Sequence, residues 1–180
     1  FDNPPPCALP IRLAQSGGFR RLLTFHSLSK RSGLPGLRSG MVAGDEKLIE
    51  AFRGFRNVAG PTVPAPLLAA SAAAWRDEDH VTAGRDLYRR KMAAAEEILG
   101  DRMTRPQGGF FLWLDVGNGE EFAHRAWAEQ GVRLLPGAYL GREIEAAKIQ
   151  SNPGFSYVRV ALVNDLSTIM TALERLRRIL

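Results

Sequence analysis

The chain has 180 residues, of which 45% are hydrophobic and 24% are charged, an ordinary composition for a globular protein of one domain or two small ones. No apolar run approaches the ~18 residues that a membrane-spanning helix needs, so we expect no membrane association. Cys7 is the only cysteine, which excludes an internal disulfide, and we therefore expect a cytoplasmic protein.

The net charge of +5 would also suit a nucleic-acid-binding protein. The arginines are spread along the chain, however, and the tight basic clusters at 89–91 and 175–178 fall within helical patterns. Charged residues in such patterns ordinarily form a solvated helix face. We therefore expect no nucleic-acid partner.

The first ten residues read F-D-N-P-P-P-C-A-L-P, without an initiator methionine. Three consecutive prolines favour an extended linker over a strand or a helix, because proline has a fixed φ and no backbone donor. We expect a linker here, and we expect the chain to be part of a longer protein.

Two strands are predicted around a polar segment. Leu22–His26 is an apolar run typical of a buried strand, and Arg38–Ala43 predicts a second strand. Ser27, Ser29 and Lys30 follow the first strand directly, and Arg38 comes eight residues after Lys30.

This polar segment has the side chains that a phosphorylated carbonyl compound requires. A lysine beside other cations, or partly desolvated, loses its proton near neutral pH and can condense with an aldehyde, and Lys30 precedes Arg31. Hydroxyls and a guanidinium bind phosphate, and a turn at Pro35-Gly36 would bring Arg38 back toward the serines. Pyridoxal 5′-phosphate (PLP) needs both kinds of group. Each of these residues taken alone is more often an ordinary surface or turn residue.

Two helices are predicted next. Asp45 is a suitable N-cap for the first, whose apolar residues are Leu48, Ile49, Phe52 and Phe55. Pro66 fits the first turn of an alanine-rich helix that reaches Trp75.

A longer helix is predicted after Asp79, with Gly100 at its end. One face of it carries Val81, Tyr88, Met92, Ala95 and Leu99. The acidic run 77–79 is interpreted as helix-end charge rather than as a pair of catalytic carboxylates.

The last part of the chain predicts a separate α+β unit. Strands are expected at 108–116, 132–135 and 157–162, helices at 120–130 and after Asp165, and a loop at 141–156. In the last strand Val158, Val160 and Leu162 alternate with Tyr157, Arg159 and Ala161. The apolar stripe of the last helix is Leu166, Ile169, Met170, Leu173, Leu176 and Leu180.

Arg159 stands in the middle of this otherwise apolar strand. An arginine in that position either extends to solvent from an edge strand or forms a specific ion pair. The pattern alone favours an edge strand and leaves the ion pair open.

The run S-L-S-K-R-S-G-L-P-G-L-R-S-G at 27–40 resembles the PLP-lysine signature of the class I/II, fold type I aminotransferases. The resemblance implies that Lys30 forms the Schiff base with PLP and that Ser27, Ser29 and Arg38 bind the cofactor phosphate. It also implies that Arg159, in the run Y-V-R-V-A-L, binds the substrate α-carboxylate.

Other segments resemble one subgroup, the succinyldiaminopimelate aminotransferases: W-R-D-E-D-H-V, R-D-L-Y, G-G-F-F-L-W-L and L-P-G-A-Y-L-G. That resemblance implies amino transfer from glutamate to N-succinyl-2-amino-6-oxopimelate in lysine and diaminopimelate biosynthesis. Gly108 to Phe110 and Tyr139 are then expected to close over the substrate. Aspartate, alanine and aromatic aminotransferases, and a non-catalytic effector domain of a transcription regulator, stay open as alternatives.

The family also implies an α/β fold and a homodimer. Residues 1–80 would be the C-terminal portion of the PLP-binding large domain with an interdomain helix, and 81–180 the small C-terminal α+β domain. The aspartate that pairs with the pyridinium nitrogen would lie upstream, so this chain alone is expected to be inactive and to keep an exposed apolar face.

We expect no metal site, since His26, His80 and His124 show no ligand spacing and no cysteine cluster accompanies them. His26, at the end of the first strand, is interpreted as a packed or partly exposed histidine rather than a cofactor contact.

Overall fold

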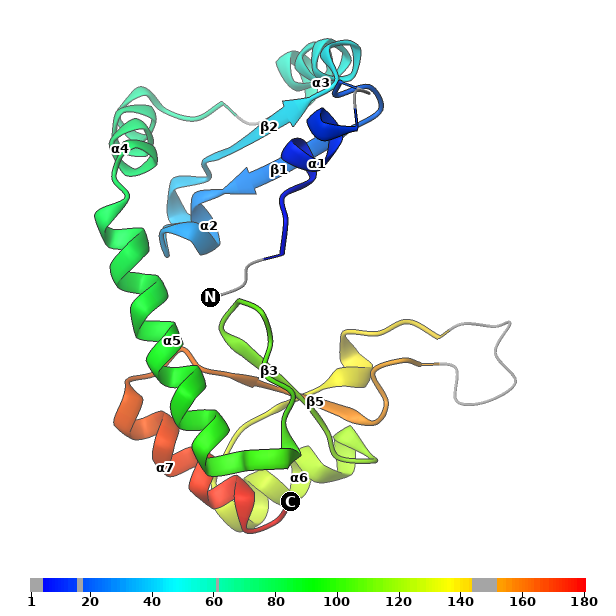
Figure 1. Ribbon diagram of the computed structural model, residues 1–180, viewed down its shortest axis with the longest axis vertical. Coiled ribbons are helices and arrows are strands. Elements are labelled where there is room, and N and C mark those ends of the chain that lie inside the picture. The colour runs from blue at the N-terminus through cyan, green and yellow to red at the C-terminus, as the bar shows by residue number, and fades with distance from the viewer. Residues whose placement is uncertain (1–4, 16–17, 61, 144–151) are drawn as a thin grey trace. The chain divides into compact units, whose positions relative to one another are not determined.

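The computed structural model describes residues 5–15, 18–60, 62–143 and 152–180 (Figure 1). The chain divides into two compact units, Pro4–Arg85 and Asp86–Leu180, each with its own sheet. We call them the first and the second unit. The assignment of 1–80 to a large domain and 81–180 to a small domain stays a prediction. Part of the predicted loop at 141–156, and of the predicted linker at 1–10, lies outside the described residues.

The first unit contains a two-stranded antiparallel sheet and several helices. Its elements are α1 (Ala8–Ala14), β1 (Leu23–Ser27), α2 (Leu28–Arg31), the 3₁₀ helix η1 (Pro35–Leu37), β2 (Gly40–Gly44), α3 (Glu46–Ala59) and α4 (Ala65–Arg76). Helix α5 (Asp79–Leu99) begins in this unit and continues into the second.

Strands β1 and β2 pair from Leu23 opposite Gly44 to Ser27 opposite Gly40. Both predicted strands are therefore present, but the expectation that the first is buried was wrong. Phe25 is 65% exposed, and its ring meets Phe52 of α3 edge-on, at 6.2 Å between centroids. A two-stranded sheet has too few neighbours to cover both of its faces, so this apolar side chain stays in solvent.

Two further expectations for the first unit need correction. Helix α1 begins at Ala8 and so includes the last three residues of the predicted linker. Pro10 is tolerated in it because the first-turn N–H groups of a helix have no intrahelical acceptor. Arg38 does not open β2: it lies at the end of η1 with φ 49° and ψ 35°, and the strand begins at Gly40.

The helix signals of the first unit are confirmed. The Asp45 carboxylate caps α3 by accepting from the backbone N–H groups of Lys47 and Leu48, at 2.9 and 3.3 Å. Pro66 lies in the first turn of α4, as predicted.

The second unit is built around a three-stranded antiparallel sheet with the order β3-β5-β4. After α5 come the 3₁₀ helix η2 (Gly100–Arg102), β3 (Phe111–Asp115), α6 (Gly119–Gln130), β4 (Leu135–Pro136), the 3₁₀ helix η3 (Gly137–Tyr139), β5 (Tyr157–Ala161) and α7 (Leu166–Arg177). Helices α6 and α7 lie on the same side of β3 and β5 (Figure 1).

The core of the second unit lies between one face of this sheet and three helices. Strand alternation is confirmed, because Val158, Val160 and Leu162 are buried and Ala161 is exposed. The helices contribute buried residues to the same cluster: Met92, Ala95 and Leu99 from α5, Phe122 and Ala126 from α6, and Ile169, Leu173 and Leu176 from α7. Met170, which we placed on the apolar stripe of α7, is 37% exposed and lies outside this core.

The strand predicted at 132–135 is shorter and shifted. The Val132 N–H donates to Ala126 O at 3.0 Å and the Gly131 N–H to Trp127 O at 3.1 Å, so both groups satisfy carbonyls at the end of α6. Gly131 adopts φ 66°, which a glycine reaches without steric cost. Val132 is therefore part of the helix end, and strand pairing begins at Leu135.

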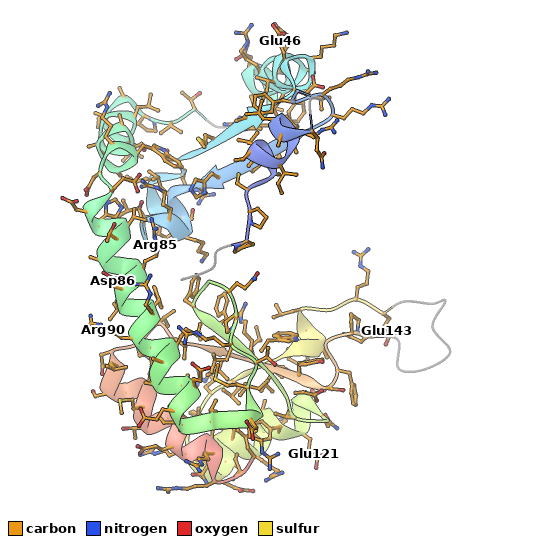
Figure 2. The ribbon with its side chains drawn as sticks, in the orientation of Figure 1. Glu46, Arg85, Asp86, Arg90, Glu121 and Glu143 are labelled. Carbon is orange, nitrogen blue, oxygen red and sulfur yellow. The ribbon has the colours of Figure 1, made fainter. Side chains whose placement is uncertain are left out.

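The surface of α5 agrees with the sequence interpretation except at one residue. Arg85, Asp86 and Arg90 project from the helix as exposed side chains (Figure 2). Lys91, which we placed on the same solvated face, is only 2% exposed. Its side chain reaches the opposite side of the helix, toward the residues that follow β5.

Replacing Leu173, which is 1% exposed, by alanine removes core contacts of α7. We expect Leu173→Ala to lower the free energy of unfolding by about 2–5 kcal/mol, since a buried cavity adds to the lost transfer energy. Urea unfolding followed by tryptophan fluorescence measures this change. Met170→Ala on the same helix is the matched control, and an equal loss in both variants would contradict this description of the core.

The Asp165 side chain caps α7, and its pKa lies well below the usual 3.8 because it accepts hydrogen bonds from the Ser167 hydroxyl and from the Thr168 N–H and hydroxyl. A lowered folded pKa stabilises the fold above the unfolded pKa, and this contribution is lost as pH falls toward the folded pKa. Asp165→Asn keeps an acceptor but has no charge to lose. We expect Asp165→Asn to have a lower free energy of unfolding than the original protein at about pH 6, and we expect this difference to become smaller as the pH falls to about 3. A deficit that does not change with pH would exclude a contribution of the charge.

Candidate functional site

Ser27 joins β1 to α2. Its backbone is extended, with φ −149° and ψ 144°, and its Oγ accepts from the Ser29 N–H at 3.1 Å, which is the geometry of an N-cap. The same Oγ lies 3.0 Å from Ser29 Oγ and 3.3 Å from Ser39 O. The structure therefore brings the two predicted serine hydroxyls together at the start of α2.

Lys30 follows in α2 and is an exposed residue. The helix that carries Lys30 is fixed by Leu28, which is fully buried. The Leu28 N–H donates to Ser39 O at 3.1 Å, and Leu28 O accepts from the Leu34 N–H at 3.2 Å. Lys30 thus stands on a short helix that is held at its base.

Arg38 has a left-handed backbone conformation, which costs a non-glycine residue about 1 kcal/mol. Its guanidinium donates to Pro35 O at 2.9 Å, and the side chain is exposed. No carboxylate of the described residues forms an ion pair with it. The predicted turn at Pro35 is present, and the pairing of Ser27 with Gly40 returns the chain past Ser27 two residues after Arg38.

The donor set of this segment fits a group that carries both a phosphate and an aldehyde. It consists of a hydroxyl pair, a guanidinium with no carboxylate partner among the described residues, and a primary amine, all between residues 27 and 38. Backbone strain persists where the surroundings hold it, and it gathers at functional positions. The left-handed conformation of Arg38 therefore adds to the chemical argument for an anion site.

A cluster around Trp75 is not predicted by the sequence. The Trp75 indole N–H donates to Ser39 Oγ at 3.1 Å, and its ring lies 5.3 Å from the Arg31 guanidinium and 5.4 Å from the His26 ring. Arg31 was considered only as a charge beside Lys30, and Trp75 only as the end of a helix. No spacing in the sequence joins residues that are 44 positions apart, so this cluster depends on the packing of α2 against α4.

Arg159, in the second unit, lies on the sheet face opposite the core. Strand β5 is the central strand, which excludes the edge strand that the pattern alone favours. The guanidinium lies 4.5 Å from the centroid of the Phe111 ring, and the side chain is half-buried. Among the described residues no carboxylate pairs with it. A ring against its flat face leaves the donors at its edge available for a carboxylate.

Lys91 is a second residue that the sequence analysis missed. Its ammonium donates to Leu162 O at 2.9 Å and to Asn164 O at 2.6 Å, and it lies 4.9 Å from the centroid of the Tyr88 ring. Burial lowers the pKa of Lys91, while the negative charge of Asp165 acts in the opposite direction. The amine ties the end of β5, the strand of Arg159, to α5.

Gly108 to Phe110 and Tyr139 are the residues expected to close over a substrate. Tyr139 is 64% exposed, and its hydroxyl donates to Glu120 Oε1 at 2.7 Å, which raises the pKa of the tyrosine. The Phe110 ring lies 4.2 Å from that of Phe111. The closing role of these residues stays a prediction.

The histidines do not form a ligand cluster. His26 contacts the Trp75 ring, and His80 Nδ1 lies 2.7 Å from Asp77 Oδ2. Within the described ranges no group of three or more histidine, cysteine or acidic side chains could hold a metal ion.

None of the helices in the described part of the chain has the length and apolar character required to cross a membrane.

Most of the chain matches one known protein family. The family model of aminotransferase class I and II matches residues 6–175. The 4-dedimethylamino-4-oxo-anhydrotetracycline transaminase of Streptomyces rimosus is 38% identical over 93% of this chain and 46% of its own length. The chain thus spans about half the length of the curated relatives that it matches.

Solved structures give the same fold. An aminotransferase from Neisseria meningitidis is 39% identical, with a TM-score of 0.89 over 97% of this chain and 44% of that protein. A probable N-succinyldiaminopimelate aminotransferase from Thermus thermophilus is 27% identical, with a TM-score of 0.76 over 91% of this chain and 43% of that protein. The α/β fold predicted from the lysine motif is confirmed, and the family to which these proteins belong is PLP-dependent.

Proposed function

The chain belongs to the aminotransferase class I and II family, and from this membership we propose that it carries the cofactor lysine and the substrate arginine of a PLP-dependent aminotransferase. The observation that supports this most directly is the arrangement of residues 27–38. A hydroxyl pair, an amine and a left-handed arginine that has no carboxylate partner among the described residues all lie within twelve residues of sequence at the end of β1.

In this proposal Ser27, Ser29 and Arg38 bind the phosphate of PLP, because hydroxyl and guanidinium donors match phosphate oxygens. Lys30 binds the aldehyde through its amine and, once released by an amino-acid substrate, moves the proton at the substrate Cα. PLP, when bound, supplies the electron sink that makes this proton acidic.

Arg159 binds the α-carboxylate of the substrate. Its guanidinium lies against Phe111 and has no carboxylate partner among the described residues, so its donors can hold both carboxylate oxygens. Holding the carboxylate at two points fixes the orientation of the Cα–H bond, so the arginine contributes to rate as well as to affinity.

For the substrate pair we propose glutamate and N-succinyl-2-amino-6-oxopimelate, in diaminopimelate and lysine biosynthesis, within a cytoplasmic homodimer. The likeness to the Thermus protein supports this choice. A second candidate acceptor is an oxo group on a polycyclic compound, which the higher identity to the Streptomyces transaminase favours. Steady-state assays of the whole protein with each acceptor, and with aspartate, alanine and aromatic donors, separate these candidates.

Borohydride reduction of the whole protein with PLP, followed by mass mapping, tests the cofactor lysine. We expect the label on Lys30, and we expect Lys30→Ala to abolish turnover while the circular dichroism spectrum is unchanged. Lys47→Ala, at an exposed lysine of α3, is the matched control and should keep both label and activity. Turnover by Lys30→Ala would refute the assignment, and an unlabelled protein would instead favour a non-catalytic domain.

Arg159→Lys keeps the charge but loses the planar pair of donors. We expect KM for the amino donor to rise by roughly tenfold or more, because bidentate contacts are lost, while the unfolding midpoint changes little. Arg133→Lys is the matched control, because Arg133 also lies over a ring, 4.9 Å from the Trp127 centroid. If both variants kept the KM of the original protein, Arg159 would not be the carboxylate residue.

A further inference from the structure

Arg31 is the residue after Lys30, but its side chain is only 8% exposed. The guanidinium donates to Ala74 O at 3.0 Å and to Asp77 O at 3.5 Å, and it forms an ion pair with Glu78. The first two acceptors are carbonyls at the C-terminal end of α4, where helix carbonyls lack intrahelical donors and the helix dipole is negative. Arg31 therefore caps α4 from α2.

Trp75 makes a second connection between the same two regions. Its ring lies against the Arg31 guanidinium, and its indole N–H donates to Ser39 Oγ. Ser39 O in turn accepts from the Leu28 N–H and lies within hydrogen-bond distance of Ser27 Oγ. A chain of contacts thus runs from α4 through Ser39 to the serine that caps the lysine helix.

These two connections hold opposite ends of one short segment. Helix α2 has only four residues, too few to be stable by its own hydrogen bonds. Arg31 fixes its C-terminal end, and Ser39 fixes its N-terminal end. Lys30 lies between these two fixed ends, so the contacts of Arg31 and Ser39 help to set its position.

We propose that Arg31 and Trp75 are positioning residues that set the location of the Lys30 amine and the Ser27 hydroxyl relative to bound PLP. This inference rests on the proposed function of Lys30. Neither residue needs to touch the cofactor. The same guanidinium also joins the lysine helix to Asp77 and Glu78, directly before α5 begins.

The test uses the whole protein and has two readouts. The first is the dissociation constant of PLP. The second is the pH midpoint of the visible absorbance of bound PLP, which reports the protonation of the group that Lys30 forms with PLP. We expect Arg31→Gln to weaken PLP binding by about tenfold, because charge-assisted bonds are lost. The midpoint should shift in the same variant. Arg31→Lys should restore little of the PLP affinity lost in Arg31→Gln, since an ammonium cannot bridge carbonyls spread along the end of a helix.

Trp75→Phe keeps a ring beside Arg31 and His26 and removes only the N–H. We expect about a threefold loss of PLP affinity, the size of one neutral hydrogen bond. Ser39→Ala should cause the same loss, and the double variant no further loss, because both remove one bond. If Arg31→Gln does not fold, the variants Trp75→Phe and Ser39→Ala still test the proposal.

Arg76→Gln is the matched control, because Arg76 is exposed and lies beside Trp75 in sequence. Its PLP affinity and midpoint should equal those of the original protein. If Arg31→Gln and Trp75→Phe both behave like Arg76→Gln, the positioning role is refuted. Absence of a borohydride label on Lys30 in the original protein would instead refute the proposed function itself, so the two failures can be told apart.

Discussion

The first unit depends on the hydroxyl of Ser27. This residue ends β1, caps α2, and bonds toward Ser39 at the start of the returning strand. The opposite pairing of Ser27 and Gly40 closes the intervening segment into a loop, and a Cβ at Gly40 would lie 2.9 Å from His26 O. The close approach of the two backbones at this point explains why residue 40 is a glycine. It also fixes the ends of the segment that carries Lys30 and Arg38.

In the second unit an equivalent constraint acts on Arg159. Strand β5 is central, so its position is set by β3 on one side and β4 on the other, and Lys91 anchors the residues that follow it. A buried ammonium is stable here because two carbonyls and an aromatic face replace its water. The strand that presents the guanidinium is therefore held on both sides at Arg159, which suits the proposed role of this residue in binding a substrate carboxylate.

The two units use cations in different ways. Arg31 and Lys91 are buried, and each bonds to backbone carbonyls, so their contribution is to the arrangement of helices and strands. Arg38 and Arg159 have no carboxylate partner among the described residues, so they remain available to an anion. The basic residues of the chain thus include structural cations as well as cations suited to phosphate and carboxylate ligands.

The sequence by itself determined the local features: the caps at Asp45 and Asp165, the alternation of β5, the turn at Pro35 and the lysine motif. Each of these depends on residues within a few positions of one another, so short spacing is sufficient to predict it. Tertiary structure alone decided the exposure of Phe25, the burial of Lys91, the central place of β5 and the contacts of Arg31 with α4. Those properties depend on which distant segments pack together, and the interaction energy of such segments is not encoded in any local pattern.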